Sequence, residues 1–278
     1  MRIDQFLSIF PTAIEGVTGP DYFTIELEQK IFGIKADELS LREKDILSAL
    51  LPVNQAQGTP VNQWVRKLSD SHFDNQSKFR VIQFIINQSI NQTDFIDSIK
   101  LLVPNVETVF FIDDYQGLII EIFQTNHLTM EEMTDIFQAM GIDFSVEIRA
   151  YVGIFIEAHQ YQPSFYQSES EHFTSLREKR KKRYIETYAD YFLSHLQGYD
   201  STDPITVYLT QKLAADDELK ALIIALWESE NSLSLTSQNL FIHRNTLQYK
   251  LKKFQEEFGF SIKNLRELTT AYLLIINQ

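Results

Sequence analysis

Residues 204–278 constrain the fold most strongly, because after Pro204 the chain contains no proline and its apolar side chains recur at helical spacing. Leu219, Leu222 and Leu226 lie three or four residues apart and would share one face of a helix. Proline breaks helices by removing a backbone donor, so its absence leaves long helices uninterrupted. We therefore expect an all-helical domain over this part of the chain.

Three helices are predicted there in quick succession, at the spacing of a helix-turn-helix motif. The first starts at Asp216 or Asp217 and ends near Ser229, the second is capped by Ser234 and covers 235–240, and the third runs from Arg244 to about Glu257. Leu240, Ile242 and Leu247 are expected to form the core between the helices. The small Ser237 is expected where the second and third helices pass closely.

The predicted third helix has one apolar stripe and one polar face. At about 100° per residue, four apolar positions fall within about 40° of Leu247 and should face inward. These are Leu247, Leu251, Phe254 and Phe258. The opposite side carries Asn245, Tyr249 and Lys252, flanked by Gln248 and Lys253, with no carboxylate before Glu256. Such a face suits the major groove of DNA.

The charge of the chain is distributed unevenly. A net charge of −13 argues against nucleic acid at first sight, because a DNA-binding surface must neutralise phosphates. From residue 231 onward, however, six basic and three acidic side chains give +3, so the first 230 residues carry −16. The sequence therefore predicts a small cationic module on an acidic body.

Side-chain chemistry divides the polar face into base readers and phosphate ligands. Asn and Gln pair with adenine, Arg with guanine and Lys with phosphate, and a helix N-terminus offers free N–H groups to an anion. Base reading is predicted for Arg244, Asn245, Gln248 and Tyr249. Phosphate contact is predicted for His243, Thr246, Lys250, Lys252 and Lys253. Periodicity and charge alone leave open an ordinary amphipathic helix with a solvated basic face.

The run NSLSLTSQNLFIHRNTLQYKLKKF (residues 231–254) closely resembles the C-terminal helix-turn-helix of PucR/CdaR-type bacterial transcriptional regulators. The resemblance lies in the core Ile-His-Arg-Asn-Thr-Leu at 242–247 and the tyrosine and basic residue that follow it. It extends over about 206–276 and implies a DNA-binding regulator. Gln248 and Lys250 stand where these proteins usually have arginines, so the resemblance implies no operator preference.

The segment before the tail predicts strands and helices in the order β-α-β-β-α-β. The expected elements are a strand at 79–86, a helix at 94–102, strands at 106–112 and 118–123, a helix from Thr129 to about Gly141, and a strand at 144–156. This order is that of a ferredoxin-like, palm-like antiparallel sheet with two helices on one face. A basic helical segment is expected to follow at 164–183. The fold class predicted for the whole chain is α+β.

In PucR/CdaR-like proteins the module before the tail is often a degenerate GGDEF, or diguanylate cyclase, domain, and the resemblance implies one here. The hairpin 113–117 (DDYQG) lies where that domain has its glycine-acid signature, but it retains only Gly117. Residues 79–92 contain no carboxylate to hold Mg²⁺. Asp113 and Asp114 are either a surviving metal pair or, the preferred interpretation, a plain turn. We expect no catalytic residue, no metal and no cofactor.

The first part of the chain predicts a small mixed unit. Residues 22–28 alternate as a strand, and Ser40 with Glu43 forms a capping box for a helix at 41–51. The polar stretch 52–60 contains two prolines, which indicates a linker. The predicted division is 1–59 for a small α/β region, 60–203 for the degenerate GGDEF-like sensory or dimerisation domain, and 204–278 for the DNA-binding domain.

Other classes of protein are disfavoured by what the sequence lacks. The chain contains no cysteine, which excludes disulfides and thiolate chemistry, and no apolar run reaches the length of a membrane span. We expect a cytoplasmic protein with no membrane partner. The basic run 177–183 (REKRKKR) is either a second DNA contact or a nucleotide-phosphate site or, by preference, a solvated helix face.

The function predicted from these features is that of a sequence-specific transcriptional regulator that is not an enzyme. It would bind double-stranded DNA as a homodimer, because one helix-turn-helix offers little interface, and it would respond to an unidentified small-molecule effector. The alternative is a small-molecule or protein-binding adaptor with a cyclase-like domain and a scaffold helical tail. Effector, operator and the sign of regulation are not encoded in any motif of the sequence.

Overall fold

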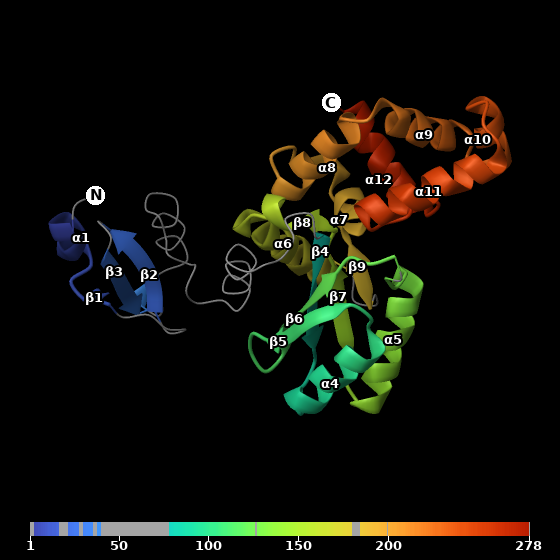
Figure 1. Ribbon diagram of the computed structural model, residues 1–278. Coiled ribbons are helices and arrows are strands. Elements are labelled where there is room, and N and C mark those ends of the chain that lie inside the picture. Colours follow the sequence, from blue (N-terminus) through green and yellow to red (C-terminus); the bar gives the residue numbers. More distant parts are fainter. Residues whose placement is uncertain are drawn as a thin grey trace. The chain divides into compact units, whose positions relative to one another are not determined.

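A computed structural model gives the fold, and the chain divides into two compact units, residues 1–72 and 73–278 (Figure 1). The helix expected at 41–51 and the linker expected at 52–60 lie outside the described residues. The structure describes residues 3–16, 22–27, 30–35, 38–39, 78–125, 127–179, 184–198 and 200–277.

The N-terminal unit packs one helix on a small antiparallel sheet. Helix α1 (Ile3–Ile9) is followed by β1 (Ile14–Glu15), β2 (Tyr22–Leu27) and β3 (Lys30–Lys35), paired in the order β1-β3-β2. The strand predicted at 22–28 is confirmed as β2. Apolar residues from the helix and the sheet share a core, whose buried members are Phe6, Ile25, Phe32, Ile34 and Leu39.

The second unit is built on a larger sheet in the strand order β5-β6-β4-β7-β9. Neighbouring strands are antiparallel except β7 and β9, which are parallel, and β8 pairs with the start of β4. Helix α4 lies between β4 and β5 in the chain, and α5 between β6 and β7. The bounds are β4 Lys78–Ile86, α4 Gln92–Leu102, β5 Val106–Phe111, β6 Gln116–Ile122, α5 Met130–Asp143, β7 Ile148–Val152, β8 Ile156–Glu157 and β9 Ile185–Thr187.

Both faces of this sheet are covered, which differs from the expectation of helices on one face. Side chains alternate along a strand, so Phe84 of β4 joins the core beneath α4 and α5, whereas Ile85 packs on the other side with Tyr151. There they meet Phe173 of α6 (Pro163–Lys179). The helix predicted at 164–183 is therefore an internal layer of the domain over most of its length.

The predicted boundaries of two strands differ from the observed ones, and each of these strands or its interruption contains a closely packed glycine. The strand expected at 144–156 is interrupted at 153–155; a Cβ on Gly153 would lie 2.3 Å from Oε1 of Glu169 on α6. The predicted turn 113–117 is shorter than expected, because Gly117 already belongs to β6. A Cβ there would lie 2.3 Å from the ring of Phe84.

The tail is helical, as predicted, and packs against the sheet domain within the same compact unit (Figure 1). Ser232, and not Ser234, caps the second helix of the predicted motif, which therefore begins at Leu233. The helices of the tail are α8 (Pro204–Ala214), α9 (Asp217–Glu228), α10 (Leu233–Asn239), α11 (Arg244–Phe258) and α12 (Leu265–Ile276). Before the tail lie the 3₁₀ helices η3 (Ala158–Gln160) and η4 (Leu196–Gly198) and the helix α7 (Tyr188–Ser194).

Candidate nucleic-acid interface

Helices α10 and α11 are joined by a tight turn with its own hydrogen bonds. The backbone N–H of Phe241 donates to the carbonyl of Gln238 at 3.1 Å, and that of Ile242 donates to the carbonyl of Ser237 at 3.0 Å. Phe241 takes a positive φ of 53°, which reverses the chain between the two helices. The turn therefore fixes where α11 begins.

The apolar stripe of α11 faces inward, as predicted. Leu247, Leu251, Phe254 and Phe258 are all buried, and the rings of the last two stack with centroids 4.5 Å apart. In α10, however, the fully buried polar residue is Thr236, whereas Ser237 is only half-buried. The Thr236 hydroxyl donates to the carbonyl of the capping Ser232 at 2.8 Å, so this buried group is hydrogen-bonded within the helix.

The polar face of α11 is open to solvent, so the residues predicted to contact DNA are accessible. Tyr249, the largest of them, has 68% of its surface exposed. No carboxylate lies in the sequence between Glu230 and Glu256, so up to Glu256 the side chains that α11 itself contributes to this face are neutral or cationic. The exposed members are His243, Arg244, Asn245, Thr246, Gln248, Tyr249, Lys252 and Lys253.

Lys250 differs from the other predicted phosphate ligands because it is half-buried and already paired. Its Nζ lies 2.6 Å from a carboxylate oxygen of Glu218 in the first turn of α9. Lys252 also has a carboxylate neighbour, Glu256, at 3.5 Å one turn along the helix, but 71% of its side chain is exposed. Contact of Lys250 with a phosphate would require the ion pair with Glu218 to open.

His243 has a structural role that sequence reasoning missed. It is the N-cap of α11, and its Nδ1 accepts a hydrogen bond from the backbone N–H of Asn245 at 3.2 Å. This bond fixes the imidazole beside the first turn of the helix and uses one of the free N–H groups there. The phosphate contact predicted for His243 would therefore fall to Nε2.

The C-terminal end of α11 is held by the sheet domain. Lys78 of β4 donates to the carbonyl of Glu257 at 3.3 Å, and the ammonium of Lys212 on α8 lies 5.2 Å from the centre of the Phe258 ring. Gly259 then takes a left-handed φ of 76°, and a Cβ there would lie 2.3 Å from the ring of Phe155. Helix α11 is thus fixed at its C-terminal end and exposed at its N-terminal end.

A buried polar cluster, which sequence reasoning also missed, joins α6 to the start of α8. His172 Nε2 lies 2.9 Å from Oδ1 of Asp203, and its Nδ1 lies 3.1 Å from the hydroxyl of Tyr151. Ser168 donates to the same Oδ1 of Asp203, while Oδ2 accepts from the backbone N–H of Thr206 at 2.8 Å. The spacing of Ser168 and His172, four residues apart on one helix, was the only sequence signal.

The electrostatics of this cluster favour an ionised Asp203. Burial alone would raise its pKa, but the hydrogen bond and charge of His172, with the Ser168 hydroxyl and the Thr206 N–H, outweigh burial and lower the pKa to about 2. Ser168, His172 and Asp203 do not form a catalytic triad, because serine and aspartate both contact Nε2 and none is open to a substrate. The cluster is therefore best described as a structural junction.

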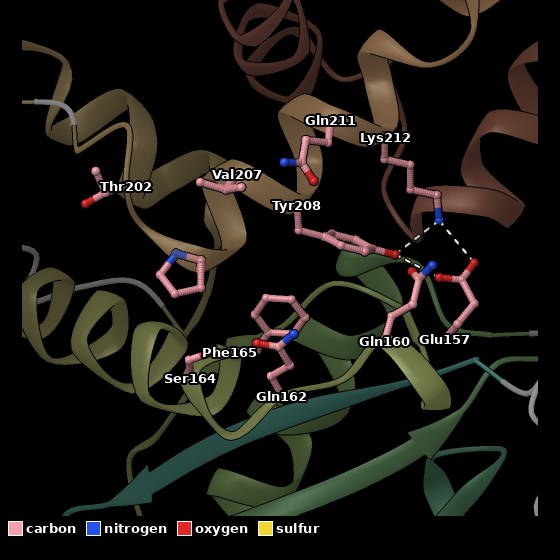
Figure 2. A pocket seen from close by; sticks show the side chains of 11 residues that line it. Glu157, Gln160, Gln162, Ser164, Phe165, Thr202, Val207, Tyr208, Gln211 and Lys212 are labelled. Atoms are coloured by element: carbon pink, nitrogen blue, oxygen red, sulfur yellow. Dashed lines mark hydrogen bonds and ion pairs between the residues drawn. The ribbon is translucent and has the colours of Figure 1, made fainter. Parts of the chain in front are cut away.

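An open cleft of about 630 Å³ lies beside this junction, between α8 and the segment from β8 to the start of α6 (Figure 2). At one end Glu157 accepts hydrogen bonds from Tyr208 at 2.8 Å and from Lys212 at 3.3 Å. Burial lowers the pKa of Lys212. The lining residues are Glu157, Gln160, Gln162, Ser164, Phe165, Thr202, Pro204, Val207, Tyr208, Gln211 and Lys212.

The hairpin between β5 and β6 folds as a plain turn. Oδ1 of Asp113 accepts from the backbone N–H groups of Tyr115 and Gln116, each at 2.7 Å, which is the local bonding typical of Asp in turns. Within the part of the chain that the structure describes, no group of three or more acidic or histidine side chains is placed to hold a metal ion.

The basic run 177–183 is described only in part. Arg177 lies over the ring of Phe173 at 5.8 Å, and residues 180–183 of the run fall outside the described residues. Among the helices that the structure describes, none has the length and apolarity required to cross a bilayer.

Comparison with known proteins bears on the C-terminal part of the chain. Residues 219–276 match the family model of the PucR C-terminal helix-turn-helix domain. The resemblance stated from the sequence is thereby confirmed for α9 to α12, whereas α8 lies outside the matched segment. The chain thus carries a helix-turn-helix domain of a type found in transcriptional regulators.

Three further similarities span most of the chain. A protein named leucine-rich protein from Streptococcus dysgalactiae subsp. equisimilis is 26% identical over 246 residues, covering 86% of each chain. The uncharacterized protein YxkF of Bacillus subtilis (strain 168) is 22% identical over 271 residues, covering 92% of this chain and 90% of YxkF. A crystal structure of a regulator of polyketide synthase expression from Bifidobacterium adolescentis aligns with a TM-score of 0.33 and 18% identity, over 71% of this chain and 80% of that one.

Proposed function

We propose that this protein is a sequence-specific DNA-binding transcriptional regulator whose helix α11 reads the major groove. The observation that carries the proposal is the division of α11 into a buried apolar stripe and an exposed, carboxylate-free face. The match of residues 219–276 to a helix-turn-helix family supports it independently. Arg244, Asn245, Gln248 and Tyr249 read bases, and the neighbouring cationic and hydroxyl groups bind phosphates.

The regulator acts as a homodimer in this proposal. A single helix-turn-helix buries too little surface for tight and specific binding, so two copies would contact half-sites about one turn of DNA apart. The dimer follows from this general requirement and not from any observed interface.

The sheet domain serves as a non-catalytic signal receiver in this proposal, a degenerate relative of GGDEF domains. What supports a signalling role is the position of the cleft, since Glu157 and Lys212 in its wall lie next to the end of α11. Glu157 also contacts Lys78, at 3.6 Å, and Lys78 donates to the carbonyl of Glu257. An effector bound in the cleft would therefore act on the residues that hold the recognition helix.

Selection of DNA by the full-length protein from a random-sequence pool, followed by titration at several salt concentrations, tests the proposal. Asn245→Ala should weaken binding to the enriched motif by about 5- to 100-fold. The variant should bind random DNA with the affinity of the parent. Lys252→Ala should weaken binding to both DNAs alike and reduce the salt slope by about one unit. Lys100→Ala, which removes an exposed lysine of α4, is the matched control and should change neither.

The alternative of an adaptor protein makes a different prediction in the same experiment. An adaptor whose tail is only a scaffold would enrich no motif and would show no difference between the Asn245 and Lys100 variants. Enrichment of a motif that is lost with Asn245→Ala contradicts the adaptor. Equal binding of cognate and random DNA by the parent contradicts the regulator.

A further inference from the structure

Phe241 stands out because its side chain is not buried against the part of the chain that the structure describes. The residue is 96% exposed, the highest value among the large apolar residues described. Exposed aromatic surface of this extent is unfavourable in water, since burial of a phenylalanine is one of the larger apolar contributions to folding. The exposure therefore points to a partner outside the chain.

The backbone at this position adds a second, independent anomaly. Phe241 has a φ of 53°, in the left-handed region that glycine enters easily and other residues rarely occupy. A glycine would make the same turn between α10 and α11 without strain. Neither the backbone nor the packing of the chain therefore favours phenylalanine here.

The surroundings of Phe241 indicate which partner covers the ring. Phe241 lies two residues before His243, the N-cap of α11. Its Cα is four residue steps from that of Asn245, or at most about 14 Å. The chain has no carboxylate side chain between Glu230 and Glu256, whereas the first 230 residues carry a net charge of −16. This local charge fits a polyanion.

We propose that Phe241 enters the major groove with the N-terminus of α11 and places its ring against the 5-methyl group of a thymine. This inference rests on the proposed function and adds an apolar specificity contact to the polar readers of α11. Thymine is the base that presents a methyl group in the major groove, and apolar side chains including phenylalanine recognise it there. The exposed ring would then be buried only in the complex.

The test uses the full-length chain, the DNA motif that it enriches from a random pool, and the same DNA with single thymines replaced by uracil. Phe241→Gly should bind the motif about 3- to 30-fold more weakly, although its thermal unfolding midpoint stays equal or rises because the positive φ is relieved. Replacement of one thymine in each half-site should cost the wild type about 3- to 10-fold. The same replacement should cost the variant nothing.

Leu101→Ala is the matched control, because Leu101 is an apolar residue of α4 that is 84% exposed and lies outside the helix-turn-helix. It should bind both DNAs as the wild type does. Wild-type affinity of Phe241→Gly for an enriched motif would overturn the role of Phe241 and leave the proposed function standing. Weaker binding with no dependence on any thymine methyl would overturn the thymine contact. Failure to enrich any motif would overturn the proposed function itself, and the role of Phe241 with it.

Discussion

Helices α6 and α11 both carry polar sequences, yet they expose their polar residues in opposite ways. On α6, Ser168, Glu169 and His172 are almost completely buried. On α11, Arg244 and Asn245 are exposed at the start of the helix. The difference comes from the number of covered sides, since α6 packs against the strands β4 and β7 and also against α7 and α8. Polarity alone therefore does not identify a binding surface.

The two helices also differ in how their charges are compensated. Buried polar groups are generally hydrogen-bonded within the protein, and on α6 Ser168 and His172 are bonded to Asp203, a residue distant in sequence. The exposed groups of α11 are hydrated instead and are available to a ligand. Changes in α6 should therefore act on stability, whereas changes in α11 should act on binding.

Asp203→Ala should give the largest effect on stability, because it leaves His172 and Ser168 without their shared acceptor and removes the N-cap of α8. Loss of one partner of a buried pair typically costs about 3 kcal/mol or more. Denaturant titration should show a drop of this size in the free energy of unfolding. Asp200→Ala, which removes an exposed carboxylate three residues earlier, should lower the free energy of unfolding much less. Equal losses for the two variants would contradict the buried junction.

Glu169→Gln should change how stability depends on pH. Burial raises the pKa of Glu169 from 4.5 to about 8. Its Oε1 accepts from the backbone N–H of Ile154 at 3.3 Å, and Oε2 has no hydrogen-bond partner among the described residues. Between pH 4.5 and 8 the folded state then holds a proton that the unfolded state has lost. The free energy of unfolding should therefore fall as the pH rises through this window.

The glutamine variant lacks this titration, so it should gain stability relative to the parent by at least about 1 kcal/mol between pH 5 and pH 8.5. Denaturant midpoints measured across the interval would show this. Glu171→Gln, at an exposed position on the same helix, is the control and should follow the parent. Parallel pH profiles for the parent and Glu169→Gln would mean that this carboxyl group is ionised in the folded protein.

The same contrast explains what the sequence could predict. Features set by local periodicity and capping were readable: the strand β4, the capping box of Thr129 and Glu132, and the buried stripe of α11 all follow from neighbours within a few residues. The exposure of the residues predicted to contact DNA was readable for the same reason, because an amphipathic helix with one apolar stripe leaves only one face for solvent. Their contact with DNA stays a prediction.

Features set by distant segments were not readable from the sequence. The burial of His172 depends on Asp203 and Tyr151, which lie 31 and 21 residues away, and no motif announces that contact. The close contact of Glu169 with Gly153, where the predicted strand breaks, and the ion pair of Lys250 with Glu218 of α9 likewise join residues of separate elements. Single-sequence periodicity carries no information on such pairs, because each arises only when the domain is assembled.

Glu218→Ala should give the smallest effect on stability, and it tests whether α11 is a binding surface. Glu218 is 82% exposed, so its ion pair with Lys250 contributes at most about 0.5 kcal/mol to folding. Its removal frees Lys250 and takes a negative charge away from α11, the helix proposed to contact DNA. Affinity for DNA should therefore rise, by about 2- to 3-fold at low salt, and the gain should shrink as salt increases. Fluorescence anisotropy with the enriched motif would measure the affinity. Asp217→Ala, which removes a carboxylate from the neighbouring position, is the control for the loss of a negative charge. A fall in affinity would mean that Glu218 positions α11 and does not merely compete with phosphate for Lys250.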